Sequence, residues 1–314
     1  MRKIELGKTG EKVSILCLGT AYFGSTVTKD VSFDLLDRYL YAGGMFIDTA
    51  NKYACWVPGF KGGESETVIG EWLKKRNNRS NVFIASKMGL PMSGTERGLS
   101  KRQIEEECNK SLKRLNINTI DLYYAHADDR FTPLEETMEA FEKLIKAGKI
   151  RHIGASNYFS WRLAEANRVC EDNGWTKYCC IEQRHSYLKP KNGLKFANQV
   201  IASEELIDYC REKNVTLLAY SPLLKGAYFR EDREFPDQYL TNNNKEKLEK
   251  LKSFAIAKNI GINQLLLSWL INNNPQVIPL IAASNILQLE DNLKCLEVKL
   301  TAEEINELND ESIY

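Results

Sequence analysis

Four residues that lie far apart in the sequence have side chains that together could protonate a carbonyl oxygen: Asp48, Tyr53, Lys87 and His126. Asp48, Lys87 and His126 each close a short apolar run, and Tyr53 follows soon after Asp48. An ammonium group beside a phenol favours the phenolate and lowers the pKa of the tyrosine. Next to Lys87, Tyr53 would therefore be a usable proton donor.

The elements that must position these residues are short apolar segments that alternate with helix-like segments, which indicates βα units around a parallel sheet. There are eight such segments, the strand number of a (β/α)8 TIM barrel, where the active site lies at the C-terminal ends of the strands. Three successive strands would then direct Asp48, Lys87 and His126 to one mouth. The predicted strands are residues 15–19, 45–48, 82–87, 120–126, 150–156, 179–186, 216–221 and 277–282.

Two further elements are expected outside the repeating units. Residues 3–6 and 13–15 flank a Gly-Lys-Thr-Gly turn and predict an N-terminal β-hairpin that plugs the bottom of the barrel. Residues 301–308 predict one extra C-terminal helix. Since no Pro/Gly/Ser-rich linker divides the chain, we expect residues 1–314 to form a single domain.

Helix starts carry recognisable capping signals. A capping box pairs a Ser or Thr at the N-cap with a Glu or Gln three residues later. Glutamates in the first turn also complement the positive end of the helix dipole, as expected after Ser203. Capping boxes are predicted at Ser100 with Gln103, at Thr132 with Pro133 and Glu135, and at Thr301 with Glu304.

The composition is that of an ordinary globular protein, with 43% hydrophobic and 27% charged residues. A net charge of +1 gives no indication of a nucleic-acid or membrane partner. No apolar run reaches the length of a membrane span, and no secretory segment follows Met1, so we expect a cytoplasmic protein. The sequence shows no apolar helix face that would be left exposed, so it gives no indication of the oligomeric state.

The eight cysteines are the one unusual feature of the composition. The sequence has no C-x-x-C motif, and the adjacent Cys179 and Cys180 would point to opposite faces of a strand. We interpret the cysteines as reduced thiols that act as small hydrophobic side chains. The three histidines lack ligand spacing to any cysteine pair, so no metal site is predicted.

A series of short motifs extends along the whole chain in a fixed order. They are Leu18-Gly19-Thr20, Phe46 through Tyr53, Glu64-Ser65-Glu66, Ala85-Ser86-Lys87, Asp121 through His126, Gly148 through Asn157, Gln183, Ala219 through Leu223, Ser284-Asn285 and Glu290-Asp291-Asn292. With these motifs the chain resembles the aldo-keto reductases over essentially its full length.

This resemblance implies an oxidoreductase that transfers a hydride between a nicotinamide cofactor and the carbonyl of a small aldehyde, ketone or sugar. The resemblance implies that Tyr53 is the general acid/base. It also implies that Lys87, which is paired with Asp48, lowers the pKa of Tyr53. His126 would orient or polarise the substrate oxygen. Positioned acid–base catalysis is typically worth about 10²–10⁴ in rate.

The resemblance also implies which residues hold the cofactor. Tyr220 would stack on the nicotinamide, and Gly19 and Thr20 would either approach the cofactor or only make a turn. The remaining candidates are Ser156, Asn157 and Gln183 for the carboxamide, Ser221, Leu223 and Gly226 for the pyrophosphate, and Ala283, Ser284, Gln288, Asp291 and Asn292 for the adenosine.

The loop after the eighth strand departs from the family pattern. Ala282 and Gln288 fall where many relatives carry Lys and Arg for the adenosine 2′-phosphate. A phosphate without such partners loses its strong charge-assisted hydrogen bonds. The cofactor is therefore expected to be NADP(H) on family grounds, with NAD(H) as the alternative that this loop favours.

Two loops could shape the substrate pocket. Trp56 and Phe60 lie in a long aromatic loop after Tyr53, where they would either form the walls of a pocket or pack against residues 88–99. Residues 224–244 contain a mixed cluster of charges, typical of solvated surface, that could alternatively cover the dinucleotide.

Two other functions stay open at this point. One is an NAD(H)-dependent dehydrogenase of sugars or polyols, which the uncharged loop after the eighth strand favours. The other is a barrel of low turnover that acts as a redox-sensing regulator, a hypothesis that the intact set of Asp48, Tyr53, Lys87 and His126 disfavours.

Overall fold

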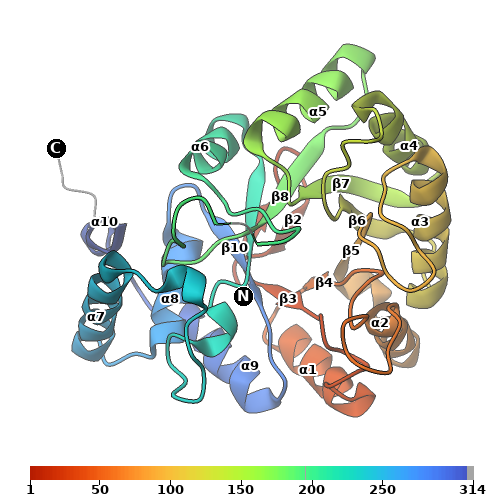
Figure 1. The fold of residues 1–314 in the computed structure, drawn as a ribbon. Helices are drawn as coiled ribbons and strands as arrows, with labels where there is room; N and C mark the ends of the chain where they lie inside the picture. The colour runs from red at the N-terminus through yellow and green to blue at the C-terminus, as the bar shows by residue number, and fades with distance from the viewer. Residues whose placement is uncertain (195, 310–314) are drawn as a thin grey trace.

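Eight parallel strands form a closed barrel in the computed structural model, which describes residues 1–194 and 196–309. The strands follow one another around the barrel in chain order, and β10 closes the ring by pairing with β3. The predicted (β/α)8 barrel is thereby confirmed, and Figure 1 shows its ring of helices. The barrel strands are β3 (Cys17–Gly19), β4 (Phe46–Asp48), β5 (Phe83–Met88), β6 (Ile120–Ala125), β7 (Ile150–Ser156), β8 (Tyr178–Arg184), β9 (Thr216–Tyr220) and β10 (Val277–Ile281).

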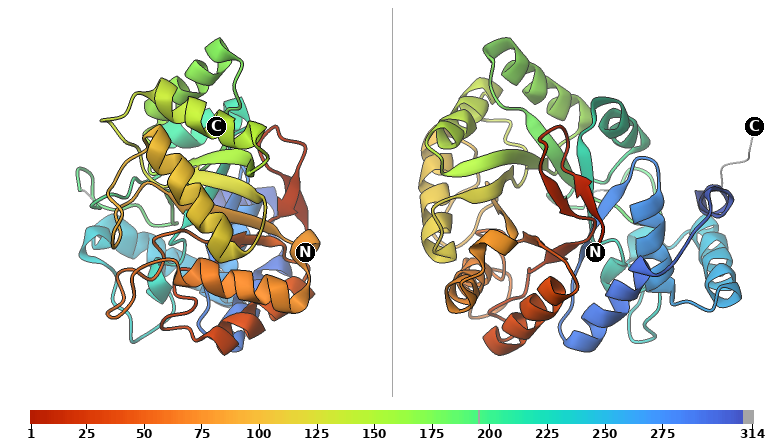
Figure 2. Two further views of the ribbon diagram at one scale, coloured as in Figure 1. Left: turned by 90° about the vertical axis from the view of Figure 1, so that its right-hand side faces the viewer. Right: turned by 180° about the vertical axis from the view of Figure 1, so that it is seen from behind.

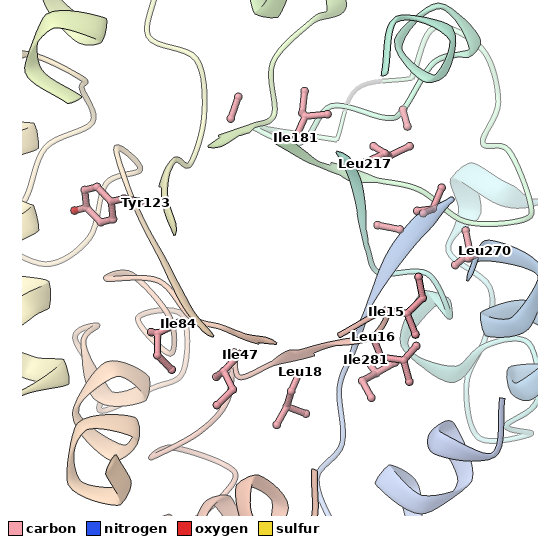
Figure 3. Close-up of a cluster of buried hydrophobic side chains, with 14 of the residues drawn as sticks. Ile15, Leu16, Leu18, Ile47, Ile84, Tyr123, Ile181, Leu217, Leu270 and Ile281 are labelled. Carbon is pink, nitrogen blue, oxygen red and sulfur yellow. The ribbon is translucent and has the colours of Figure 1, made fainter. Parts of the chain in front are cut away.

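Alternate side chains on each strand face the inside and the outside of the barrel. The outward set packs against the helices, and Figure 3 shows Ile47, Ile84 and Ile181 pointing away from the barrel centre. The inward set forms a second apolar cluster that includes Phe46, Phe83, Ala85, Leu122, Tyr124, Cys180, Leu218 and Ile278. The lower part of the barrel is therefore a packed core, and polar inward residues are left for its upper layer.

The N-terminal hairpin closes the other end of the barrel. Its strands β1 (Lys3–Glu5) and β2 (Lys12–Ser14) pair antiparallel, as predicted. Leu6 and Val13 are fully buried in the inward cluster, where they fill the space below the lowest strand residues. In Figure 2 the red hairpin crosses the barrel opening in the view from behind.

The helices pack outside the barrel, and the predicted C-terminal helix is present as α10. α7 and α10 lie outside the main ring (Figure 1). Residues 310–314, part of the predicted domain 1–314, lie outside the described residues. The α-helices are α1 (Lys29–Tyr41), α2 (Glu64–Arg76), α3 (Lys101–Leu115), α4 (Leu134–Lys146), α5 (Ser160–Asn173), α6 (Glu204–Lys213), α7 (Asn242–Ala257), α8 (Ile262–Asn272), α9 (Ile286–Leu293) and α10 (Ala302–Asn309). Short 3-10 helices span Arg79–Asn81, Leu224–Gly226, Asp237–Tyr239 and Lys294–Leu296.

Most of the predicted caps form. Ser100 and Gln103 make both bonds of a capping box on α3, and Ser203 caps α6. The capping box predicted at Thr132 is wrong, because Pro133 is the N-cap of α4 and makes no side-chain cap bond. The Thr132 hydroxyl instead donates to Asp129 Oδ2 at 2.6 Å, a nearby carboxylate that competes successfully for it.

No individual helix among the described residues has both the length and the apolar composition to span a membrane. Only α7 and α8 taken together satisfy those two conditions, and they meet at a bend of 99°.

Candidate active site

The upper layer of the barrel interior contains charged side chains. The two-residue period of β4 places Asp48 above Phe46, and that of β5 places Lys87 above Ala85. Both Asp48 and Lys87 are fully buried. Burial of a charge is costly unless the charge is paired, so each of these side chains depends on the other.

The Lys87 ammonium lies at the centre of this site. Its Nζ lies 2.5 Å from both carboxylate oxygens of Asp48, and it donates to the Thr49 carbonyl oxygen at 3.1 Å. Its third contact is with the Tyr53 hydroxyl oxygen at 2.9 Å. Burial lowers the pKa of Lys87, but Asp48 and Glu182 outweigh that effect, so its pKa is raised and the ammonium keeps its charge.

Tyr53 connects this pair to the mouth of the barrel. Its ring is carried by a turn after β4, in which its N–H bonds the Ala50 carbonyl oxygen at 3.2 Å. The hydroxyl donates to Asp48 Oδ2 at 2.9 Å and accepts from Lys87. Tyr53 and His126 are each 9% exposed, whereas Asp48 and Lys87 are fully buried.

The expectation that Lys87 lowers the pKa of Tyr53 is not met in this arrangement. Burial raises the pKa of Tyr53 well above its usual value, and the negative charges of Asp48 and Glu182 raise it further. The hydroxyl also donates to Asp48, and this bond favours the protonated phenol. Tyr53 is therefore held in its protonated form, beside the Lys87 ammonium.

His126 lies beside the tyrosine, directly after β6. Its ring centroid is 6.2 Å from that of Tyr53, with an interplanar angle of 73°. Burial, together with the charges of Lys87 and Lys52, lowers the pKa of His126 well below its usual value. The imidazole is therefore neutral near pH 7 and retains one N–H that can donate to a carbonyl oxygen.

The site also contains a residue that the sequence analysis did not select, Glu182. It lies on β8 and is 3% exposed, and its Oε2 is 3.4 Å from Lys87 Nζ. Its position on the inward face follows from the alternation with Cys180, an apolar-cluster residue two positions earlier. That alternation was the signal available in the sequence, but it identifies the inward face only once the register of the strand is known.

The residues assigned to the nicotinamide carboxamide lie together at the ends of β7, β8 and β9. Gln183 Oε1 accepts from the Asn157 N–H at 2.6 Å, and Asn157 donates to Ser156 Oγ at 3.0 Å. The Tyr220 hydroxyl donates to Asn157 Oδ1 at 2.8 Å, while its ring is partly exposed. Asn157 has a left-handed backbone with φ of 56°, a conformation that Asn adopts more readily than most residues. These bonds join the three strand ends, and the partly exposed Tyr220 ring could stack on a flat cofactor.

The loop after β9 has an unusual backbone conformation. Ser221, Leu224, Lys225 and Gly226 all have positive φ values, between 46° and 92°. The N–H groups of Leu224 and Gly226 donate to the carbonyl oxygens of Ser221 and Leu223, at 3.1 and 2.8 Å. A cavity of about 460 Å³ lies beside this loop, lined by Leu224, Lys225, Glu231, Asp232, Arg233, Glu234 and Pro236. None of Asp48, Tyr53, Lys87 and His126 lines it.

Comparison with known proteins decides the family. The model of the aldo/keto reductase family matches residues 15–312. The chain belongs to the aldo/keto reductase family. It is accordingly a carbonyl-reducing oxidoreductase.

Relatives of this aldo/keto reductase are similar over nearly its whole length. Norsolorinic acid reductase stcV of Emericella nidulans is 32% identical, over 96% of this chain and 79% of that protein. The uncharacterized oxidoreductase YrpG of Bacillus subtilis is also 32% identical, over 97% of this chain and 94% of that protein. Among solved structures, the thermostable aldo-keto reductase Tm1743 in complex with the inhibitor epalrestat aligns with a TM-score of 0.78 and 27% identity, covering 99% of this chain and 100% of that one.

The loop after β10 of this aldo/keto reductase is held by its own hydrogen bonds. Gln288 Oε1 accepts from both the N–H and the hydroxyl of Ser284, each at 2.9 Å. Asn292 donates to the Ala282 carbonyl oxygen, and Ala283 is buried. Asp291 accepts from Asn263 and Gln264, so its carboxylate is engaged with the start of α8. The other adenosine candidates lie around the loop after β10. Residues 281–293, which include this loop, contain no Lys or Arg.

Gly19 and Thr20 have a clear structural part. Thr20 donates to the Asp48 carbonyl oxygen from its N–H at 3.0 Å and from its hydroxyl at 2.7 Å. Gly19 pairs with Asp48 in the sheet register. Together they fix the end of β4 and thereby the direction of the Asp48 side chain.

The two substrate candidates are placed differently. Trp56 is 46% exposed, and its ring meets Tyr53 edge to face at 6.0 Å. On its other side it meets Tyr22 at 5.9 Å, a 40% exposed residue that the sequence analysis did not select. Phe60 lies further along the loop, bonded through its N–H to Val57, and makes no ring contact with Tyr53. Trp56 and Tyr22 thus form the aromatic side of the mouth.

The cysteines in this aldo/keto reductase are all free thiols, mostly buried. Within residues 1–194 and 196–309, no group of three or more His, Cys, Asp or Glu side chains could hold a metal ion.

Proposed function

We propose that this aldo/keto reductase reduces an aldehyde or ketone to the alcohol, with Tyr53 as the proton donor and a nicotinamide dinucleotide as the cofactor. The observation that carries the proposal is the Tyr53 hydroxyl, which is bonded between Asp48 Oδ2 and Lys87 Nζ, each at 2.9 Å. When bound, the cofactor supplies a hydride to the carbonyl carbon.

The charge distribution of the site fits proton donation by Tyr53. When the substrate oxygen accepts the phenolic proton, the oxygen that remains faces the Lys87 ammonium at 2.9 Å. The same ammonium lies 4.8 Å from the centre of the Tyr53 ring, a favourable cation–π distance. Preorganised charges of this kind stabilise the charge that develops in a transition state without costly reorganisation.

The role proposed for His126 is to hold the substrate oxygen. Its ring lies beside that of Tyr53, with the centroids 6.2 Å apart, and burial lowers its pKa so that the ring is neutral. A neutral imidazole can donate one hydrogen bond to a carbonyl oxygen without adding a proton to it. Tyr53 and His126 would then approach the same oxygen from two sides.

The cofactor proposal rests on the residues at the ends of the later strands. Ser156, Asn157 and Gln183 would hold the carboxamide, and Tyr220 would stack on the nicotinamide ring. Ser156 Oγ accepts from Asn157 and keeps its own proton for a further bond. Ser221, Leu223 and Gly226 would lie along the pyrophosphate, in the loop after β9 where the backbone is left-handed at Ser221 and Gly226.

The family generally uses NADP(H), and we propose NADP(H) here with a reduced preference over NAD(H). Arg and Lys supply the strong bonds to a 2′-phosphate, and the loop after β10 has Ala282 and Gln288 instead. The same observation favours the second candidate function, oxidation of a sugar or polyol with NAD(H).

A direct assay tests the reaction and its cofactor together. Purified protein is mixed with NADPH or NADH and para-nitrobenzaldehyde, and loss of the reduced cofactor is followed by absorbance. We expect reduction with both cofactors and faster turnover with NADPH. Preferential NADH use, with oxidation of polyols by NAD⁺, would support the second candidate, and inactivity with both cofactors and both substrate classes would overturn the proposal.

A further inference from the structure

Glu182 is the one carboxyl group close to the Lys87 ammonium for which the proposed reaction has no use so far. Its Oε2 lies 3.4 Å from Lys87 Nζ and has no hydrogen-bond partner among the described residues. Asp48 holds the same ammonium through both oxygens at 2.5 Å. The two carboxyl groups therefore compete for one cation, and Asp48 has the better geometry.

Glu182 lies where its charge interacts strongly with neighbouring charges. It is paired in register with Ser156 on one side and Leu218 on the other, deep in the strand layer. Both Leu218 beside it and Cys180 two positions earlier on β8 belong to the apolar cluster inside the barrel. A carboxylate here has little water to solvate it, so its interaction with nearby charges is strong.

The net charge of the buried site depends on whether Glu182 is protonated. With Glu182 protonated, the Asp48 carboxylate and the Lys87 ammonium balance each other. With Glu182 ionised, the group has two negative charges and one positive charge. Two carboxylates that share a site cannot easily both ionise, so one of them holds its proton to a higher pH.

We propose that Glu182 is a positioning residue of the carbonyl reduction, which acts through Lys87 and Asp48 and sets the net charge that faces Tyr53. This inference rests on the proposed function of Tyr53 as proton donor. When Glu182 is neutral, the Lys87 ammonium supports the phenolate that Tyr53 leaves after donation. When Glu182 is ionised, it draws on the same ammonium and repels the phenolate.

Glu182 should change its protonation state within a pH range in which the reaction can be assayed. Burial and the Asp48 charge raise the pKa of Glu182 to about 8, against the opposing effect of Lys87. Its ionisation in turn helps to raise the pKa of Tyr53. The titratable and charged groups that face it from the surrounding elements are Cys17 of β3, Asp48 of β4, Tyr53 after β4, Lys87 of β5, Tyr124 of β6, Cys180 of β8 and Tyr220 of β9.

The test compares the pH dependence of the chemical step in the wild type and in Glu182→Gln. Single-turnover reduction of para-nitrobenzaldehyde by bound NADPH is measured from neutral to alkaline pH. We expect the wild-type rate constant to fall on the order of tenfold as Glu182 ionises, corresponding to about one pKa unit on Tyr53. Glu182→Gln, which cannot ionise, should keep the neutral-pH rate constant across that range.

A matched control separates this effect from the loss of any buried acid. Glu142 on α4 is a buried carboxyl bonded to the Thr176 N–H at 2.9 Å, outside the barrel interior. Glu142→Gln should retain the wild-type alkaline fall. If Glu182→Gln does not fold, Glu182→Asp shortens the side chain and should shift the midpoint of the fall, and an unchanged midpoint would overturn the proposal.

The outcomes distinguish a failure of the role proposed for Glu182 from a failure of the proposed function. Turnover with the same alkaline fall in wild type and Glu182→Gln would overturn the role of Glu182 alone. Absence of turnover in the wild type would overturn the proposed function itself. As a second readout, carbon-13 spectra of glutamate-labelled protein should show one carboxyl that titrates near pH 8, and that signal should be missing in Glu182→Gln.

Discussion

The Lys87 ammonium donates to the Tyr53 hydroxyl oxygen at 2.9 Å and lies 4.8 Å from the centre of the same tyrosine ring. The two distances place the cation beside the phenol oxygen, at the edge of the ring that carries the hydroxyl. Because Lys87 is fully buried, neither contact is screened by water. This relationship makes Tyr53 the residue whose chemistry the site is built to control, and it leads to the first prediction.

Tyr53→Phe should reduce the rate constant of reduction by about 10²–10⁴, the usual contribution of a positioned acid. Cofactor binding should remain, because the ring and its contact with Trp56 are kept. Steady-state rates and quenching of tryptophan fluorescence by NADPH measure the two properties. Tyr123→Phe, which removes a buried hydroxyl on the outer face of β6, serves as the control and should keep its turnover. Wild-type rates in Tyr53→Phe would contradict the assigned role.

Lys87→Met should destabilise the protein by about 3–5 kcal/mol, because it leaves the Asp48 carboxylate buried and unpaired. The loss should be smaller at acidic pH, where Asp48 and Glu182 can take up protons; burial raises the pKa of both groups. Urea unfolding at two pH values measures it. Lys143→Met removes an exposed pair with Glu139 and should cost less than about 1 kcal/mol. Equal effects of the two variants would show that the buried pair adds nothing.

The reduction rate should show no acidic inflection near the ordinary histidine pKa of 6.5. Because burial lowers the pKa of His126, its imidazole stays neutral as the pH falls through that value. The unfolded chain does bind a proton there, so folding stability should decrease as the pH drops below 6.5. Rates and unfolding free energies measured across this range check both statements. An inflection near 6.5 that disappears in His126→Gln would refute the neutral assignment.

Gln288→Arg should increase the ratio of NADPH to NADH affinity by about tenfold, since one charge-assisted contact to the 2′-phosphate is worth about 1.4 kcal/mol. Gln288 lies in the first turn of α9, where its side chain now accepts a hydrogen bond from the Ser284 N–H. Leu287→Arg places a cation on the same helix at a site that is 78% exposed, and it should leave the ratio unchanged. Fluorescence titrations with both cofactors give the ratio. An identical shift in both variants would indicate a general charge effect.

The barrel could be predicted from the sequence because local signals agreed with one another. Apolar runs with strand composition alternated with capped helices, and the Ser100 cap formed as its spacing with Gln103 predicted. The positions of Asp48 and Lys87 followed from their places at strand ends. The Thr132 cap failed because a carboxylate brought by the loop, Asp129, took its hydroxyl.

The electrostatics of the site could not be read from residue types alone. The sequence shows a lysine and a tyrosine, and it predicts a lowered tyrosine pKa from that pair. The structure adds the burial of Tyr53 and the hydrogen bond to Asp48, which reverse the direction. Glu182 was missed for a related reason, since only the strand register shows which side of β8 faces Lys87.

The hairpin at the base of the barrel has a consequence for proton exchange. Because Leu6 and Val13 are fully buried there, the acids of the interior are covered on that side. A dinucleotide bound across the mouth that Tyr53 borders would cover these acids on the other side as well. We then expect Asp48, Lys87 and Glu182 to exchange protons with the solvent more slowly in the cofactor complex than in the free protein.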